Sequence, residues 1–143
     1  NSYFQIKIAE EACDKLGLKY VEATVSNSNE IQQVVQSLCG KVDVIYTPTD
    51  NMIAAGMSLV SQVATENKIP TIVGEEGMVK NGGLATYGVN YYELGKQTAK
   101  MAVEILEGRS KPADMPIQYL DKCNLAVNEE IAKKLGITIP ADL

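Results

Sequence analysis

Apolar positions recur with helical spacing in long blocks of the chain, and short β-prone runs separate these blocks. In residues 2–16 an apolar residue occurs at every fourth position and Gly17 follows, which predicts a helix that ends there. The stripe consists of Phe4, Ile8, Ala12 and Leu16. We predict that Asn1 or Ser2 caps this helix, because Asn and Ser side chains accept hydrogen bonds from free backbone N–H groups.

The same reading predicts the remaining elements. Four further helices are predicted over residues 31–38, 52–63, 91–106 and 129–135. Five runs are predicted to be strands, namely 20–25, 42–47, 71–74, 84–89 and 117–120, with a loop over 75–83. Short strands that alternate with longer helices are typical of a parallel sheet with helices on both faces. The predicted fold class is therefore α/β, a three-layer sandwich with a mainly parallel sheet.

The composition is that of one globular domain, with 45% apolar and 22% charged residues in 143 positions. No apolar run approaches the roughly 20 residues of a membrane-spanning helix. The formal net charge is −5, and the 13 Lys and Arg residues are scattered along the chain. Because nucleic-acid binding needs a basic patch, we expect no nucleic-acid partner.

The chain contains no His, which removes His-dependent nucleophilic catalysis and the commonest metal ligand. Its three cysteines, Cys13, Cys39 and Cys123, form no CxxC pair, so they predict neither a zinc site nor a disulfide framework. Neither a dinucleotide-binding glycine pattern nor a GxxxxGK[ST] phosphate loop occurs. We therefore expect no metal, no cofactor and no enzymatic activity.

Ligands of open parallel sheets bind beyond the carboxyl ends of the strands. Polar segments follow the predicted strands at this rim, and the first helix opens on it: 26–29, 47–51, 74–77 and 1–3. Helix N-termini can bind a carboxylate there. Asp50, Glu75 or Glu76 could neutralise an ammonium group. The combination suits a zwitterion such as an amino acid.

Each of these side chains also has a purely structural interpretation. Asp50 and Asn51 are favoured helix caps in any protein, and Glu75 with its neighbour can belong to a solvated loop. Tyr46 and Tyr87 are at strand ends near the rim, where they could stack on a ligand or simply pack. The residue pattern leaves these alternatives open.

Five short strings in a fixed order carry a resemblance to a known family. They are VDVIYTPTDN at 42–51, PTIVGE at 70–75, ATYGVNYYELG at 85–95, ILEG at 105–108 and LAVN at 125–128. In this order they resemble the ABC-transporter substrate-binding lipoproteins of the tryptophan/tyrosine-binding type, which have the type I periplasmic-binding-protein fold. The resemblance covers essentially all 143 residues.

The resemblance implies a two-lobed protein of roughly twice this length. Each lobe would be a Rossmann-like sandwich, and the ligand would lie in a cleft that closes by a hinge. Residues 1–143 would then form a single lobe, residues 87–90 the hinge segment, and residues 91–108 a helix that packs on the other lobe. Because that lobe lies outside this sequence, the apolar surface of residues 91–106 predicts a homodimer or a rearranged packing.

The resemblance also implies roles for residues at the rim. The expected ligand-binding residues are Asn1, Ser2, Asp50, Asn51, Glu75 and Tyr87, and the expected hinge residues are Gly88, Val89 and Asn90. Asp50 is expected to receive the α-ammonium group of the ligand.

The implied function is that of the solute-binding component of an ABC importer, which binds an amino acid, aromatic amino acids included, and works with an ABC permease. Such proteins are extracytoplasmic lipoproteins. An alternative with the same fold is the effector-sensing lobe of a repressor-type transcription regulator. A response-regulator-like domain is disfavoured, because Asp43 lies inside a predicted strand and no Lys follows a strand in the way that phosphoryl chemistry requires.

Overall fold

The computed structural model describes residues 2–142, so the predicted cap and ligand residue Asn1 lies outside the described residues. The helices are α1 (Ser2–Leu16), α2 (Ile31–Leu38), α3 (Asn51–Ala55), α4 (Met57–Glu66), α5 (Glu76–Lys80), α6 (Tyr91–Leu106) and α7 (Glu129–Leu135). The strands are β1 (Ile45–Thr47), β2 (Thr71–Val73), β3 (Ala85–Gly88) and β4 (Asn124–Val127). Two 3-10 turns complete the set, η1 (Ser28–Glu30) and η2 (Pro112–Asp114).

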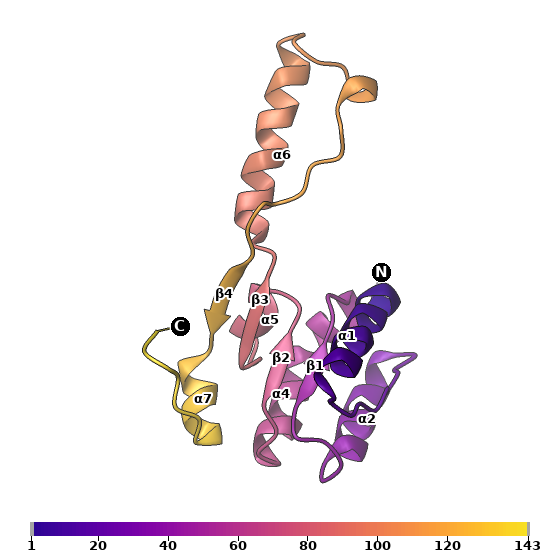
Figure 1. Cartoon of the computed structure of the whole chain (residues 1–143), viewed down its shortest axis with the longest axis vertical. Helices are drawn as coiled ribbons and strands as arrows, with labels where there is room; N and C mark the ends of the chain where they lie inside the picture. The colour runs from indigo at the N-terminus through magenta and orange to yellow at the C-terminus, as the bar shows by residue number, and fades with distance from the viewer. Residues whose placement is uncertain (1, 143) are drawn as a thin grey trace.

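The four strands form one sheet in the order β1-β2-β3-β4 (Figure 1). β1 pairs in parallel with β2 and β2 with β3, whereas β4 is antiparallel to β3. The predicted α/β class with a mainly parallel sheet is therefore confirmed.

The main hydrophobic core lies between one face of the sheet and the helices α2 and α4. It contains Ile45 and Val73 from the strands, Ile31 from α2, and Met57 and Val60 from α4. Three of these side chains, those of Ile31, Met57 and Val60, are at most 1% exposed. Burial of a side chain of this size stabilises the fold by about 1.5–3 kcal/mol, so these contacts fix α2 and α4 on the sheet.

Two predicted elements differ in the structure, one at a close contact with another helix and one through a helix cap. The predicted helix over 52–63 is split at Gly56, where an added Cβ would lie 2.4 Å from Cδ1 of Ile31. The predicted loop over 75–83 contains α5, because the Glu75 side chain caps its first turn. Capping chemistry therefore created a short helix that hydrophobic spacing did not indicate.

Two predicted strands are wrong. Residues 20–25 and 117–120 form no ladder, whereas Asn124–Val127, which was not predicted, pairs with β3 over four residues. A β-prone run becomes a strand only where a second backbone completes its hydrogen bonds. Among the described residues, no second backbone pairs with residues 20–25.

The apolar stripe predicted for α1 faces outward. Phe4, Ile8 and Leu16 are 68%, 53% and 73% exposed. Partly buried positions on α1 include Gln5 and Ala9 instead. The apolar spacing therefore predicted the helix correctly, but no other described part of the chain covers this apolar stripe.

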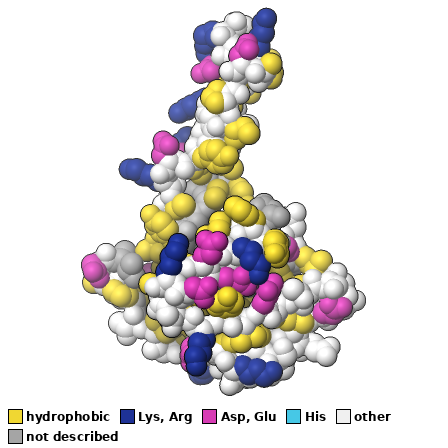
Figure 2. Space-filling model, turned by 45° about the vertical axis from the view of Figure 1, so that its right-hand side comes forward, with side chains coloured by type: hydrophobic (Ala, Val, Ile, Leu, Met, Phe, Trp, Pro, Cys, Tyr) yellow, Lys and Arg dark blue, Asp and Glu magenta, His cyan; other side chains and the backbone are white. Residues whose placement is uncertain are grey.

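The helix α6 forms an arm that projects away from the sheet, and the segment from its end to β4 returns beside it (Figure 1). No residue of α6 is buried. Gln97 Nε2 joins the two limbs of the arm by donating to Gln118 Oε1 at 2.9 Å and to the Tyr119 carbonyl oxygen at 3.2 Å. Hydrophobic side chains lie exposed along the arm (Figure 2). Homodimerisation through this helix stays a prediction.

Candidate functional site

Three loops meet at the carboxyl edge of the sheet. The loop after β1 touches the loop after β2 at Gly74, where an added Cβ would lie 2.5 Å from the Thr49 backbone nitrogen and 2.8 Å from the Pro48 carbonyl carbon. The loop after β2 is joined to the loop after β3 by a parallel bridge between Glu75 and Val89. Two of the predicted rim segments, 47–51 and 74–77, thus meet at this edge, and the loop after β3 joins the second of them.

Asp50 follows the outermost strand β1 and is held at the carboxyl edge by three hydrogen bonds. Its Oδ1 accepts from the backbone N–H groups of Met52, at 2.9 Å, and Ile53, at 3.1 Å, which caps α3. Its Oδ2 accepts from the Ser2 hydroxyl at 3.0 Å. The Ile53 N–H first of all, and then the Ser2 hydroxyl, hold the pKa of the Asp50 carboxyl below its ordinary value. The side chain is therefore a fixed negative charge at neutral pH.

Gln5 clamps the start of α1 onto the same loop. Its Oε1 accepts from the Thr49 backbone N–H at 3.0 Å, and its Nε2 donates to the Thr49 hydroxyl. Gln5 and Ser2 are three residues apart, so they share one face of α1. Sequence reasoning missed Gln5, because Gln is common in helices, and only its three-residue spacing from Ser2 could have indicated it.

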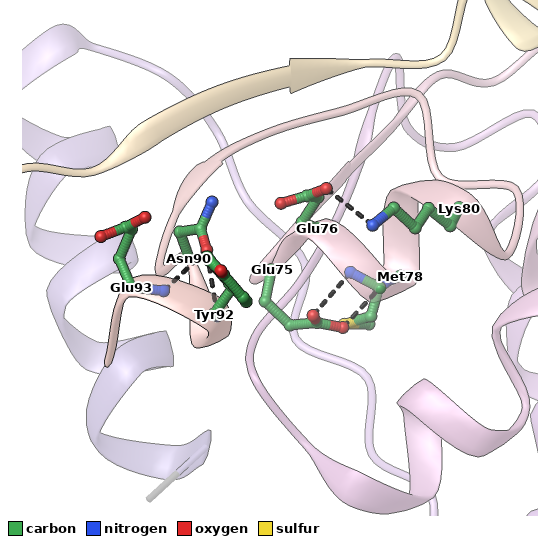
Figure 3. Close-up of polar contacts among 8 residues, drawn as sticks. Glu75, Glu76, Met78, Lys80, Asn90, Tyr92 and Glu93 are labelled. Atoms are coloured by element: carbon green, nitrogen blue, oxygen red, sulfur yellow. Dashed lines mark hydrogen bonds and ion pairs between the residues drawn. The ribbon is translucent and has the colours of Figure 1, made fainter. Parts of the chain in front are cut away.

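Glu75 and Asn90 both cap helices that begin at this edge (Figure 3). The two carboxylate oxygens of Glu75 accept from the N–H groups of Gly77, at 2.6 Å, and Met78, at 2.7 Å. Asn90 Oδ1 accepts from the first turn of α6, from the N–H of Tyr92 at 3.0 Å and that of Glu93 at 3.2 Å. Both side chains thus have a structural role, which the sequence had left open for Glu75.

The adjacent carboxylates of residues 75 and 76 serve different partners. Glu76 Oε1 lies 2.7 Å from the Lys80 Nζ one turn along α5, whereas Glu75 turns back to cap the helix (Figure 3). Neither arrangement forms a paired acid–base dyad. Among residues 2–142 there is also no group of three His, Cys, Asp or Glu side chains that could hold a metal ion.

Aromatic side chains lie on the sheet face opposite the main core. Tyr46 is paired with Ile72 in register, and Ile72 with Ala85, so Tyr46 and Tyr87 share this face. Tyr46 is 40% exposed and Tyr87 74% exposed. Partial burial raises the pKa of the Tyr46 hydroxyl. Both rings are open to a ligand or to a second layer of protein.

The remaining predicted residues can be placed briefly. Asn51 is exposed at the first position of α3, next to Asp50, and Gly88 ends β3 with its backbone against Gly74. An added Cβ at Gly88 would lie 2.5 Å from the Gly74 carbonyl oxygen. Ligand and hinge roles for these residues stay predictions.

Comparison with known proteins identifies the family. The model of the family described as ABC transporter substrate binding protein matches residues 1–143. The chain belongs to this family. A curated member, the tyrosine-binding protein of Clostridioides difficile strain R20291, is 43% identical over 137 residues, which are 96% of this chain and 39% of that protein.

Two solved structures share the fold over nearly the whole of this chain. One is the ligand-free, open structure of a substrate-binding protein with adhesive properties from Clostridium difficile, with 46% identity and a TM-score of 0.78. Another is an ABC domain from Streptococcus pneumonia in complex with L-Trp, with 37% identity and a TM-score of 0.89. Each comparison covers 99% of this chain and 48% of the solved chain. This substrate-binding chain therefore spans about half the length of those solved chains.

No helix within residues 2–142 is long and apolar enough to cross a membrane.

Proposed function

We propose that this chain is one lobe of a solute-binding protein that serves an ABC importer, and that its ligand is an aromatic amino acid. The observation that carries the proposal is the fixed Asp50 carboxylate in the loop after β1, one residue beyond the contact of this loop with Gly74, on the edge where open α/β sheets bind ligands. Two relatives support the class of ligand, because one is described as tyrosine-binding and another holds L-Trp.

The proposed site is one wall of an interlobe cleft. Pockets for small molecules bury about 70–90% of the ligand surface, which a single open edge cannot do. The solved relatives are about twice as long as this chain, so they have room for a second wall. We propose that residues 87–90 form the hinge and that α6 packs on the second lobe, as its exposed Tyr92 and Leu106, at 73% and 85%, support.

The ligand contacts follow from the chemistry of the edge. Asp50 is proposed to bind the α-ammonium group, because its charge is fixed and its Oδ2 has one protein partner. Ser2, Asn51 and Tyr87 are proposed as neighbouring contacts. Glu75 directs both carboxylate oxygens to α5, so its proposed contribution is the shape of the cleft edge. Binding is proposed to leave the ligand chemically unchanged.

The cellular setting is proposed from the family. A substrate-binding protein of an importer acts outside the cytoplasm, tethered as a lipoprotein, and delivers its ligand to an ABC permease. The family match favours this role over the effector-sensing lobe of a transcription regulator, which shares the fold.

The test is calorimetric titration of the two-lobed protein with L-Trp and L-Tyr. Asp50→Asn keeps the cap on α3, because Asn caps as well as Asp does, but it removes the charge. Losing a charged hydrogen bond costs about 1.5–3 kcal/mol, so we expect roughly tenfold to hundredfold weaker binding. Asp43→Asn, at an exposed position before β1, is the matched control and should bind normally. Unchanged affinity in Asp50→Asn would refute the assigned role.

A further inference from the structure

Asn81 is the one asparagine in the sequence that a glycine follows. It is the C-cap residue of α5 and is exposed, and the Gly82 after it has a φ angle of 111°. Because glycine has no Cβ, its backbone nitrogen can approach the side-chain carbonyl carbon of the asparagine before it without steric hindrance. Asparagine is for such reasons a thermolabile residue. At residues 81–82 the chain can therefore react with itself.

The two reacting groups are held by the last turn of a short helix. The Gly82 N–H donates to the Val79 carbonyl oxygen at 3.1 Å, and the Asn81 N–H donates to the Gly77 carbonyl oxygen at 3.0 Å. α5 has only five residues, and the ends of helices fray and open locally. Opening of this turn frees the Gly82 nitrogen and lets the backbone rotate next to Asn81.

Asn67 shows the contrast at another helix end. Its Nδ2 donates to the Val63 carbonyl oxygen at 2.8 Å, so the amide is fixed on α4. Lys68 follows it, and a residue with a side chain hinders the approach of its own nitrogen to the asparagine. Asn67 must therefore lose a hydrogen bond and overcome this crowding before it can react, whereas Gly82 offers no such hindrance at Asn81.

We propose that Asn81 is a site of spontaneous deamidation, a covalent modification whose co-reactant is water. The Gly82 nitrogen gives up its proton and bonds to Cγ of Asn81, while the Cγ–Nδ2 bond breaks and ammonia leaves with a proton. Water then opens one of the two C–N bonds of the cyclic imide. Opening at Cγ gives an aspartate, and opening at the backbone carbonyl carbon gives an isoaspartyl link, in which the chain continues through Cγ. The inference does not depend on the proposed ligand.

The isoaspartyl link does not fit its surroundings. The Gly82 carbonyl oxygen accepts from the Ser61 hydroxyl at 2.7 Å, and an added Cβ at Gly82 would lie 2.4 Å from the Ser61 Oγ. The link places one more carbon in the backbone, so Gly82 must move away from Ser61. The Gly83 N–H, which donates to the Met78 carbonyl oxygen at 2.9 Å, must move with it. The modification therefore loosens α5, whose other end is capped by Glu75 at the edge of the candidate site (Figure 3).

Mass spectrometry of peptides from the 143-residue chain tests the proposal, after incubation at neutral pH and physiological temperature. We expect conversion at Asn81 to be at least roughly tenfold faster than at Asn67, because the Asn67 amide must first lose a hydrogen bond. In Asn81→Gln the longer side chain disfavours ring closure, so conversion at this position should disappear. Conversion at Asn81 that is no faster than at Asn67 would overturn the proposal.

A second measurement tests the structural consequence. Asn81→Asp carries the new negative charge on an unchanged backbone, so it is the matched control for the isoaspartyl form, which chromatography separates from the parent chain. We expect the isoaspartyl form to unfold at a lower urea concentration than Asn81→Asp, and its Gly83 amide to exchange at least roughly tenfold faster. Equal urea midpoints and equal exchange in the two forms would refute the displacement of Gly82 from Ser61.

Discussion

At Gly74 the loop after β2 lies directly against the backbone of the loop after β1, and Gly74→Ala should separate these two loops. An added Cβ would lie 2.5 Å from the Thr49 backbone nitrogen, 2.8 Å from the Pro48 carbonyl carbon and 2.9 Å from the Thr49 Cγ2. Ordinary contacts between such atoms begin near 3.4 Å, so all three are too short. Two of the three atoms belong to the backbone, which cannot rotate away as a side chain can.

The cost of this overlap follows from its geometry. Overpacking by a methyl group costs about 1–3 kcal/mol where the neighbours cannot give way. Since the overlap at Gly74 involves backbone on the loop that Gln5 also clamps, we expect a loss of about 2–3 kcal/mol in the free energy of unfolding. Asp50, one residue beyond Thr49, should move with the loop, so ligand affinity of the two-lobed protein should fall as well.

The free energy of unfolding is measured by urea denaturation, with circular dichroism as the signal. Gly95→Ala is the matched control, because nothing lies within 4 Å of an added Cβ in the middle of α6. That variant should be neutral or slightly stabilising, since Ala favours a helix interior over Gly by about 0.5–1 kcal/mol. If Gly74→Ala unfolds at the same urea concentration as the parent chain, the close approach of the two loops is not a constraint and the reasoning is refuted.

Two further predictions concern polar side chains, namely two buried threonines and the half-buried Asp50. The hydroxyls of Thr86 and Thr71 are in side chains that are each 2% exposed, but only the Thr71 hydroxyl has a partner, the Leu84 N–H at 3.2 Å. Thr86→Val should therefore raise the free energy of unfolding by about 1 kcal/mol and Thr71→Val should lower it by a similar amount in urea titrations; equal effects of one sign would contradict this. Asp50 has a lowered pKa in the folded chain, so its carboxylate stabilises the fold above its ordinary pKa of 3.8, and this contribution disappears as pH falls through the lowered value. The stability difference between the parent chain and Asp50→Asn should accordingly shrink as pH falls below the ordinary value of 3.8 and through the lowered pKa, and a constant difference would exclude the linkage.

Much of the fold could be predicted from local pattern. The apolar spacing of residues 2–16, 91–106 and 129–135 predicted α1, α6 and α7, because a helix satisfies its own backbone hydrogen bonds and needs only a suitable run of residues. Alternation of such helices with β-prone runs predicted the mainly parallel sheet. The order of these elements also predicted the rim on which Asp50 and Glu75 lie.

Contacts between distant segments decided the rest. Residues 20–25 have the composition of a strand, but no described backbone pairs with them. Asn124–Val127 form a strand because their backbone pairs with that of β3. Gln5 reaches the site because α1 folds back onto a loop 44 residues away, and the outward stripe of α1 has no cover among the described residues. The sequence by itself determined that the segments of α1, α2, α6 and α7 are helical, since that depends on neighbours in the chain. Strand pairing, burial and the partners of the site residues depend on which surfaces meet, and only the tertiary structure decides that.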